Sequence, residues 1–140
     1  MKISFITLLP LFLVLSTSCN TTKMQTKSLM SSNWTLEEMD GKSMSEEVTL
    51  EFSEGKINGK SFCNQYFSNC TYSKETISVE AIGSTKRACQ MMAEERQYFE
   101  RLQTIKSYEM KDGNLHLKCE QGDLVFSSAQ PKLSKTKSKQ

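Results

Sequence analysis

Residues 48–53 read VTLEFS, and this stretch decides what kind of fold we expect. Valine, leucine and phenylalanine alternate here with threonine, glutamate and serine. Successive side chains of a β-strand point to opposite faces of the sheet, so the alternation predicts a strand with one buried face and one wet face. Three further stretches alternate in the same way, at residues 76–80, 108–111 and 115–120.

Turn-forming residues separate these stretches, as they do between consecutive strands. They are Glu54-Gly55, Asp112-Gly113-Asn114 and Gln121-Gly122-Asp123. We expect Trp34–Met39 to open the sheet and Leu124–Phe126 to close it.

The segment from residue 88 to residue 105 has a helical period instead. The residues that share one helical face are Met91, Tyr98, Leu102 and Ile105. Antiparallel strands with one wet face need a cover for the other face, and one helix can supply it. We therefore predict a mainly β, α+β domain: an antiparallel, partly closed β-barrel-like sheet with one helix inserted between two groups of strands.

The charge of the chain is nearly balanced over its 140 residues, with 18 Lys+Arg against 16 Asp+Glu and a net charge of +2. This length suits one domain, and the balance argues against nucleic-acid binding, which would need a basic stripe. The balance hides an uneven distribution, because residues 33–128 hold 11 Lys+Arg against 16 Asp+Glu and carry −5. The expected domain is therefore acidic and lies between basic ends.

The amino-terminal segment has the features of an export signal. Lys2 precedes an apolar run from Ile3 to Leu15, which is shorter than the roughly 20 residues that span a bilayer. Small residues then lead to Cys19, which resembles a bacterial lipobox, where the signal is cut before a lipid-bearing cysteine. We expect a signal peptide at 1–18 and lipid on Cys19; the alternative is a plain signal peptide in which Cys19 is incidental.

Polar segments flank the domain expected at residues 33–128. Residues 19–32 lack aromatic residues and a sustained period, which indicates a lipidated flexible tether. Residues 129–140 hold four lysines and no acid, which predicts a basic disordered tail. The alternative for the tail is a contact with anionic lipid or surface glycan.

Four cysteines remain when Cys19 is assigned to the lipid: Cys63, Cys70, Cys89 and Cys119. An even number in an exported chain predicts structural disulfides, and four cysteines allow three connectivities. Free buried thiols are one alternative. Zinc is the other and is disfavoured, because the chain has no CxxC pair and export favours oxidation.

Several motifs in the middle of the chain occur together and in a fixed order. Residues 57–66 read INGKSFCNQY, residues 82–89 read IGSTKRAC, and residues 94–102 read EERQYFERL. With the opening WTL at residues 34–36, they resemble the META domain, the family that includes the HslJ heat-shock lipoproteins. The resemblance covers residues 33–127, and it implies envelope stress tolerance through binding.

The resemblance also bears on the cysteines. Cys63 and Cys89 lie in two of the family motifs, so we expect them to pair, which leaves Cys70 and Cys119 for a second bridge. The alternative for Cys119 is a buried free thiol. Phe62 stands where the family has a glycine before the Cys-Asn pair.

Asn64, Thr85 and Arg87 flank the expected Cys63–Cys89 bridge and should lie together if it forms. One interpretation is a polar recognition patch, with the Arg87 guanidinium offered to a carboxylate or phosphate. The other is that Asn64 and Thr85 hydrogen-bond their own loops. An aromatic cluster in the same stretch is interpreted as core or as the lining of a barrel mouth. Its members are Phe62, Tyr66, Phe67 and Tyr72.

Little in the sequence points to catalysis. His116, the single histidine, falls on the wet face of its strand, and no serine stands in a nucleophile motif. Adjacent carboxylates such as Glu94-Glu95 diverge from one another and are interpreted as solvated faces. We therefore expect no catalytic residue, no metal site and no cofactor.

The expected function is that of a META-like envelope lipoprotein, non-enzymatic, acting in stress tolerance or as an interaction module. Its expected partners are the membrane, through lipid on Cys19, and an unknown envelope protein or small ligand, with no nucleic acid and with the chain monomeric. The expected location is the bacterial cell envelope, with the outer membrane favoured and the domain in the periplasm or at the surface. One alternative is a barrel that binds a small hydrophobic ligand or inhibits a protease. Another is an envelope hydrolase, which would need a polar cleft with converging carboxylates.

Overall fold

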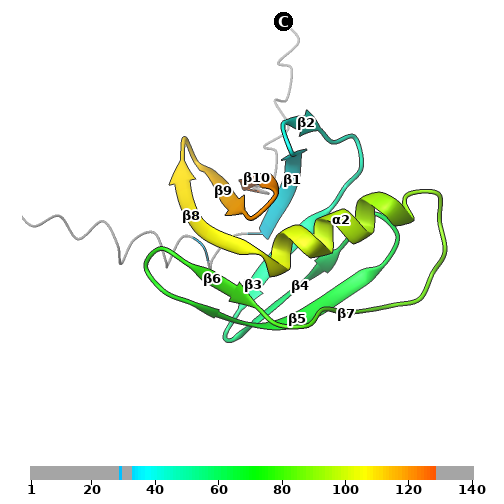
Figure 1. Ribbon diagram of the computed structural model, residues 1–140, viewed down its shortest axis with the longest axis horizontal. Helices are drawn as coiled ribbons and strands as arrows, with labels where there is room; N and C mark the ends of the chain where they lie inside the picture. The colour runs from blue at the N-terminus through cyan, green and yellow to red at the C-terminus, as the bar shows by residue number, and fades with distance from the viewer. Residues whose placement is uncertain (1–28, 30–32, 129–140) are drawn as a thin grey trace, which may run out of the picture.

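The computed structural model describes Leu29 and residues 33–128; the expected signal peptide, Cys19 and the expected tail lie outside these residues. The elements follow the order strands, helix, strands (Figure 1). The first strands are β1 (Asn33–Met39), β2 (Lys42–Ser43), β3 (Thr49–Ser53), β4 (Lys56–Lys60), β5 (Gln65–Tyr72), β6 (Ile77–Val79) and β7 (Gly83–Ser84). They are followed by the helix α2 (Met92–Gln103) and by β8 (Ile105–Lys111), β9 (Asn114–Cys119) and β10 (Gly122–Ser128).

The strands form one curled antiparallel sheet in the order β6-β5-β4-β3-β1-β10-β9-β8, with β2 beside β1 and β7 beside β5. The two ends of this order meet, because β6 contacts β8 and the backbone N–H of Tyr108 donates to the carbonyl of Glu75 at 3.0 Å. The sheet is thus a nearly closed barrel, and α2 crosses it between the two strand groups (Figure 1). The predicted fold class is confirmed.

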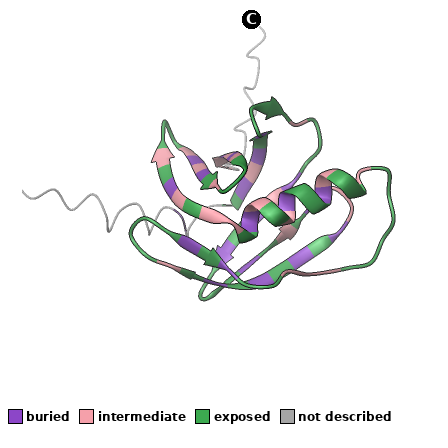
Figure 2. Ribbon diagram, in the orientation of Figure 1, coloured by how far each residue is buried: buried purple, intermediate pink, exposed green. Residues whose placement is uncertain are grey.

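Most of the described strands lie where the sequence pattern predicts a strand. The VTLEFS stretch forms β3, in which Leu50 and Phe52 are buried and Glu51 is exposed. Figure 2 shows this alternation as bands of buried and exposed residues along the strands. The other predicted strands correspond to β1, β6, β8, β9 and β10.

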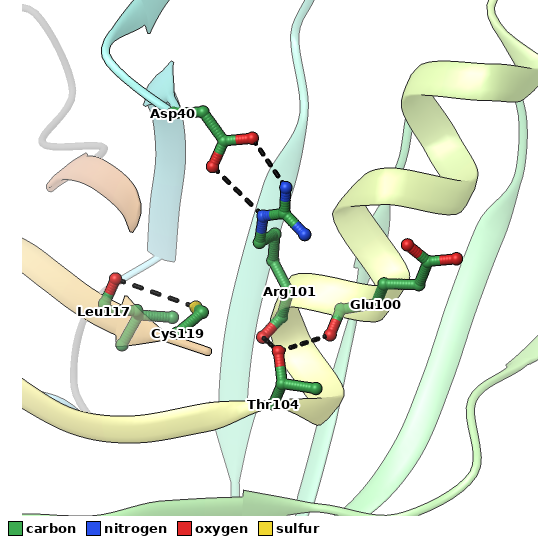
Figure 3. A network of polar contacts seen from close by, with 6 residues as sticks. All are labelled: Asp40, Glu100, Arg101, Thr104, Leu117 and Cys119. Atoms are coloured by element: carbon green, nitrogen blue, oxygen red, sulfur yellow. Dashed lines mark hydrogen bonds and ion pairs between the residues drawn. The ribbon is translucent and has the colours of Figure 1, made fainter. Parts of the chain in front are cut away.

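The helix is shorter than the predicted range of 88–105. It ends before Thr104, whose backbone N–H bonds the carbonyl of Arg101 at 3.1 Å and whose hydroxyl bonds the carbonyl of Glu100 at 2.8 Å (Figure 3). Ile105 then begins β8 instead of continuing the helix. Among the described residues, no helix is long and apolar enough to cross a bilayer.

Large aromatic side chains fill the interior of the barrel. Trp34, Tyr66, Tyr98 and Phe126 are each at most 2% exposed. The Tyr66 and Tyr98 hydroxyls lie 2.7 Å apart, and the Tyr66 hydroxyl also donates to the carbonyl of Thr49 at 2.8 Å. Both phenols therefore keep hydrogen-bond partners inside the core, as buried polar groups require.

The core also includes Leu29, which lies within the tether expected at residues 19–32. Its side chain is fully buried, and its carbonyl accepts a hydrogen bond from the indole Nε1 of Trp34 at 3.2 Å. The packing of the domain therefore reaches back beyond residue 33. A single leucine in a polar stretch has no periodicity that could have placed it in the core.

Gly59 of β4 leaves the space in which Tyr66 reaches across to Thr49. A Cβ atom at position 59 would overlap the carbonyl oxygen of Thr49 and lie 2.9 Å from the Tyr66 hydroxyl. Because the clash is with backbone of a paired strand, the neighbour cannot simply rotate away.

We expect Gly59→Ala to lower the free energy of unfolding by about 2 kcal/mol, the usual cost of overpacking a close-packed site. Urea denaturation at pH 7 measures this change. Lys56→Ala, at an exposed position of the same strand, is the matched control and should stay within about 0.5 kcal/mol of the wild type. Equal midpoints for Gly59→Ala and the wild type would contradict the proposed close approach.

Candidate functional site

The carboxylate of Glu95, near the start of α2, lies at the centre of a dense polar cluster. The residue is buried, with 4% of its surface exposed. Its Oε2 accepts hydrogen bonds from the backbone N–H groups of Cys63 and Asn64, both at 2.9 Å, and from the Ser61 hydroxyl. Its Oε1 accepts from Nδ2 of Asn64 at 2.7 Å. One carboxylate therefore holds residues 61–64 against the helix.

The side chain of Asn64 extends this cluster to a third segment. Its Oδ1 accepts from the Thr85 hydroxyl and from the backbone N–H of Arg87, both at 2.7 Å. Its Nδ2 donates to the carbonyl of Arg87 at 3.1 Å as well as to Glu95. The amide thus uses both its acceptor sites and both its donor hydrogens, and no capacity remains for a ligand.

A disulfide between Cys63 and Cys89 closes the same junction, with the two Cα atoms 5.8 Å apart. This is the pairing that the family resemblance implied. It brings together the three residues of the expected patch, Asn64, Thr85 and Arg87, although Arg87 takes part through its backbone. The exposed Arg87 side chain borders a small pocket of about 290 Å³.

Hydrogen bonding sets the protonation state of Glu95. Burial by itself raises the pKa of this carboxyl, but the donors of Ser61, Asn64 and Cys63 outweigh it and hold the pKa below the ordinary value of 4.5. Glu95 is therefore an anion at neutral pH and has no proton to donate. Its chemistry is that of a clamp for the surrounding loops.

The interpretation of Glu95 as part of a solvated face is wrong. Glu95, Tyr98 and Leu102 are spaced at i, i+3 and i+7, so they share the face of α2 that is buried. The same three residues form the E-x-x-Y-x-x-x-L part of the family pattern. The helical spacing was therefore a signal that could have placed Glu95 in the interior. The role of Ser61 had no comparable signal.

A second polar cluster joins the last turns of α2 to the turn between β1 and β2 (Figure 3). The guanidinium of Arg101 donates to Asp40 through Nε at 3.1 Å and through Nη2 at 2.8 Å. The hydrogen bond from Arg101 is the main cause that lowers the pKa of Asp40. The backbone N–H of Asp40 bonds the carbonyl of Asp123 at 2.8 Å, so the pair connects the helix to the β1–β2 turn and to β10.

The expected Cys70–Cys119 bridge is wrong, since both thiols are free. Cys70 lies within β5 in register with Val79, whereas Cys119 ends β9 in register with Ile105 of β8. Where the barrel closes, β6 and β8 stand between β5 and β9. A disulfide needs Cα atoms less than about 7 Å apart, which neighbouring strands can supply and separated ones do not.

The free thiols are poorly reactive. Burial raises the pKa of Cys70, and burial with the nearby charge of Asp123 raises the pKa of Cys119 to about 12. The Cys119 Sγ is also directed at the carbonyl of Leu117, 3.8 Å away (Figure 3). Because the thiolate is the reactive form, neither group is suited to nucleophilic or redox chemistry near neutral pH.

The expected aromatic cluster is divided between core and surface. Tyr66 is buried, Phe62 and Tyr72 pack partly against the core, and Phe67 is 67% exposed. Phe62 lines a cavity of about 440 Å³ between the β1–β2 region and α2, but Tyr72 does not. The stretch therefore contributes to the core through three rings, and Phe67 alone stands outside it.

A hollow of about 740 Å³ lies on the outer face of β1, β3, β4 and β5. Phe67, Thr85 and Gln65 are among its lining residues. His116 lies elsewhere, half-buried on β9 in register with Val125. Within the described residues, no group of three or more His, Cys, Asp or Glu side chains is arranged to hold a metal ion.

Comparison with known proteins gives a family and a fold. The family model of the META domain matches residues 27–131. A protein from Burkholderia xenovorans, solved by NMR, superposes with a TM-score of 0.59 at 23% identity, covering 75% of this chain and 86% of its own. A second NMR structure superposes with a TM-score of 0.60 at 19% identity, covering 72% and 92%. No curated protein matches the chain significantly.

The carboxylate clamp predicts a pH-dependent stability. We expect Glu95→Gln to lower the free energy of unfolding at pH 7 by about 2–4 kcal/mol, because charge-assisted bonds are lost and buried N–H groups lose their acceptor. The folded pKa of Glu95 is depressed, so its contribution is complete above the unfolded pKa and is lost as pH falls through the folded value. The difference between variant and wild type should therefore shrink between pH 5 and pH 3.

Urea unfolding at several pH values from 7 to 3 measures this dependence. Glu100→Gln, at an exposed position of the same helix, is the matched control and should follow the wild type throughout. A Glu95→Gln variant that is as stable as the wild type at pH 7 would refute the clamp.

The thiol assignments predict a simple peptide map. Alkylation of the native chain at pH 7.5 should leave Cys70 and Cys119 largely unmodified, because burial keeps both groups as neutral thiols. Alkylation in urea without reductant should modify both, while Cys63 and Cys89 appear as one cross-linked peptide pair. A cross-linked Cys70–Cys119 pair would show that the structure assigns the thiols incorrectly.

Proposed function

The chain belongs to the META domain family, and on that premise we propose that it is a non-enzymatic interaction module of the bacterial cell envelope. In this proposal lipid on Cys19 holds the domain at a membrane, with the outer membrane favoured, and the module serves stress tolerance. The observation that carries the proposal is that the buried side chains of Glu95 and Asn64 are hydrogen-bonded to neighbouring segments of the domain.

The side chains of Glu95 and Asn64 are committed to the fold. Both oxygens of Glu95 and all four hydrogen-bonding positions of the Asn64 side chain are occupied by neighbouring segments. A general acid or base must instead be within reach of a proton on the substrate. The commitment of these groups supports a role in holding a surface in shape for binding, without turnover.

The filled interior bears on the choice between binding roles. The space inside the barrel is occupied by the rings of Trp34, Tyr66, Tyr98 and Phe126. A barrel that carries a small hydrophobic ligand keeps that space open. The filling therefore favours an outer surface over an internal cavity as the place of interaction.

The lipid anchor gives the most direct test of the proposed location. We expect the chain, expressed in its own host, to fractionate with membranes and to carry the mass of a lipid-modified amino-terminal cysteine. Cys19→Ser should release the domain from the membrane fraction, because one residue with several acyl chains provides the attachment. Intact mass spectrometry and fractionation measure both properties, and an unmodified mature chain would contradict the anchor.

The functional half of the proposal is tested by deletion and titrated rescue. Loss of the chain should sensitise the host to envelope stress such as detergent or heat. A binding module acts stoichiometrically, so the rescue should rise in proportion to the amount of protein. Full rescue by trace amounts would instead indicate turnover, and an unchanged stress response would contradict the proposed role. Met92→Ala, a surface variant, is a suitable control for rescue by a folded chain.

A further inference from the structure

One row of residues runs straight across the outer face of five strands. Asn33 of β1 is in register with Glu51 of β3, which faces Asn58 of β4. Asn58 is in register with Phe67 of β5, and Phe67 with Gly83 of β7. Four steps between strands of about 4.8 Å each make this row roughly 19 Å long.

Most of this row lines the hollow on the outer face of the sheet. Of its members, Asn33, Glu51, Asn58 and Phe67 line the hollow of about 740 Å³. Its volume lies within the range of about 300–1,000 Å³ that small-molecule sites occupy. The face is thus shaped to receive an elongated ligand.

The phenyl ring of Phe67 is unusual in this setting. It occupies the wet face of β5, between the exposed residues Gln65 and Asn69, and is 67% exposed. A lone exposed apolar residue needs no functional explanation. Phe67 differs because its ring is seated: a Cβ atom at Gly83 would lie only 2.8 Å from the ring Cζ. The ring of Phe67 can therefore pack over position 83 only because glycine has no side chain there.

Hydrogen-bonding side chains surround the ring. The side-chain amide of Gln65 and the hydroxyl of Thr35 line the hollow and make no hydrogen bond to another described residue. The carboxylate of Glu51 accepts one bond, from Nδ2 of Asn58 at 3.2 Å, and keeps further lone pairs for a ligand. An aromatic face beside the amide of Gln65, the hydroxyl of Thr35 and the carboxylate of Glu51 offers both stacking and hydrogen bonding.

The charge of the hollow is close to balanced. It contains Glu47, Glu51 and Lys60, and Lys60 lies 3.8 Å from Glu47 in an exposed pair. A polyanion such as phosphate would find one cation against two carboxylates. The face therefore suits an uncharged ligand that is rich in hydroxyl groups.

We propose that this face binds a segment of neutral glycan, with one sugar ring stacked on Phe67. The C–H groups on one side of a pyranose ring are attracted to the electron-rich face of an aromatic ring. The hydroxyl groups at the edge of the sugar then donate to Glu51, and they donate to or accept from the side-chain amides of Gln65 and Asn58. The inference rests on the proposed binding role, names its ligand class, and does not depend on lipid at Cys19.

Binding is tested with the full chain purified from its host in a detergent without sugar groups, since a maltoside would compete. The probes are the tetramers of glucose and of N-acetylglucosamine, titrated while amide NMR shifts and binding heat are recorded. We expect at least one tetramer to bind, with shifts concentrated on β3, β4 and β5. The affinity should change little between 50 and 500 mM salt, because no ion pair with the ligand is involved.

Variants assign the binding to the ring. Phe67→Ala should weaken binding about tenfold or more, whereas Phe67→Trp should stay within about threefold of the wild type. Gly83→Ala keeps the aromatic residue but displaces it and should also weaken binding. Thr71→Ala, an exposed site further along β5, is the matched control and should change neither affinity nor melting temperature. Since Phe67 is exposed, its variants should melt with the wild type.

Several results would overturn the inference. They are failure of both tetramers to bind, wild-type affinity in Phe67→Ala, loss of binding in 500 mM salt, and preference of the same face for an extended peptide. Cleavage of the tetramer during the titration would assign Glu47 and Glu51 to hydrolysis and would contradict both this inference and the non-enzymatic proposal. If the tetramers do not bind while membrane anchoring and stress rescue persist, the glycan inference alone fails.

Discussion

The structure depends on one buried carboxylate. Taking an ionised carboxyl out of water is costly unless its oxygens are fully hydrogen-bonded. Glu95 meets that condition because the loop of Ser61, Cys63 and Asn64 turns its donors toward the start of α2. If the carboxylate were removed, the backbone N–H groups of the loop would be buried without an acceptor. The position of the helix and the shape of the loop are therefore fixed together, and neither is stable without the other.

The helix is held at both ends, by different means. Near its start, Glu95 and the Cys63–Cys89 disulfide connect it to the first group of strands and to the segment that leads into the helix. Near its end, Arg101 bonds Asp40 in the β1–β2 turn, and the backbone N–H of Asp40 in turn bonds the carbonyl of Asp123 in β10. The disulfide closes the loop between Cys63 and Cys89. In the chain-entropy model this closure contributes about 3.5 kcal/mol to the stability of the fold, mostly by restricting the unfolded chain. Holding both ends fixes α2 against β6 and β10, one strand from each group.

The sequence was sufficient to predict the parts that follow one regular period. Alternation located β3, β8 and β9, and the fold class followed from strands on both sides of one helix. It missed β5 because the inward positions of that strand include the polar Ser68 and the outward positions include Phe67, which reverses the expected pattern. The cluster around Glu95 was hidden for a related reason, since a glutamate beside another glutamate has the appearance of a surface residue. The Cys70–Cys119 pairing was predicted because these two cysteines were left after Cys63 and Cys89 had been paired. Only the strand order shows that they lie on strands that are not neighbours.

Strand β5 breaks the usual pattern, because the polar Ser68 points inward and the aromatic Phe67 points outward. The polar groups inside the domain and those on its outer face have different roles. Inside, polar groups such as those of Glu95, Asn64 and Tyr66 are hydrogen-bonded within the fold, so they stabilise one arrangement of the chain. On the outer face, Phe67 occupies a position where a polar side chain is usual. Gly83, its register partner on β7, leaves room for the ring. Such an exposed ring adds little to the stability of the chain, because most of its surface stays in water. A rigid frame with its internal bonds satisfied is what allows an exposed ring to keep a fixed position, and a fixed position lowers the entropy cost of binding. The hydrogen bonds of Glu95 and the outer face around Phe67 are connected in this way. The bonds in the interior hold the strands in place, and the outer face presents Phe67 to a ligand.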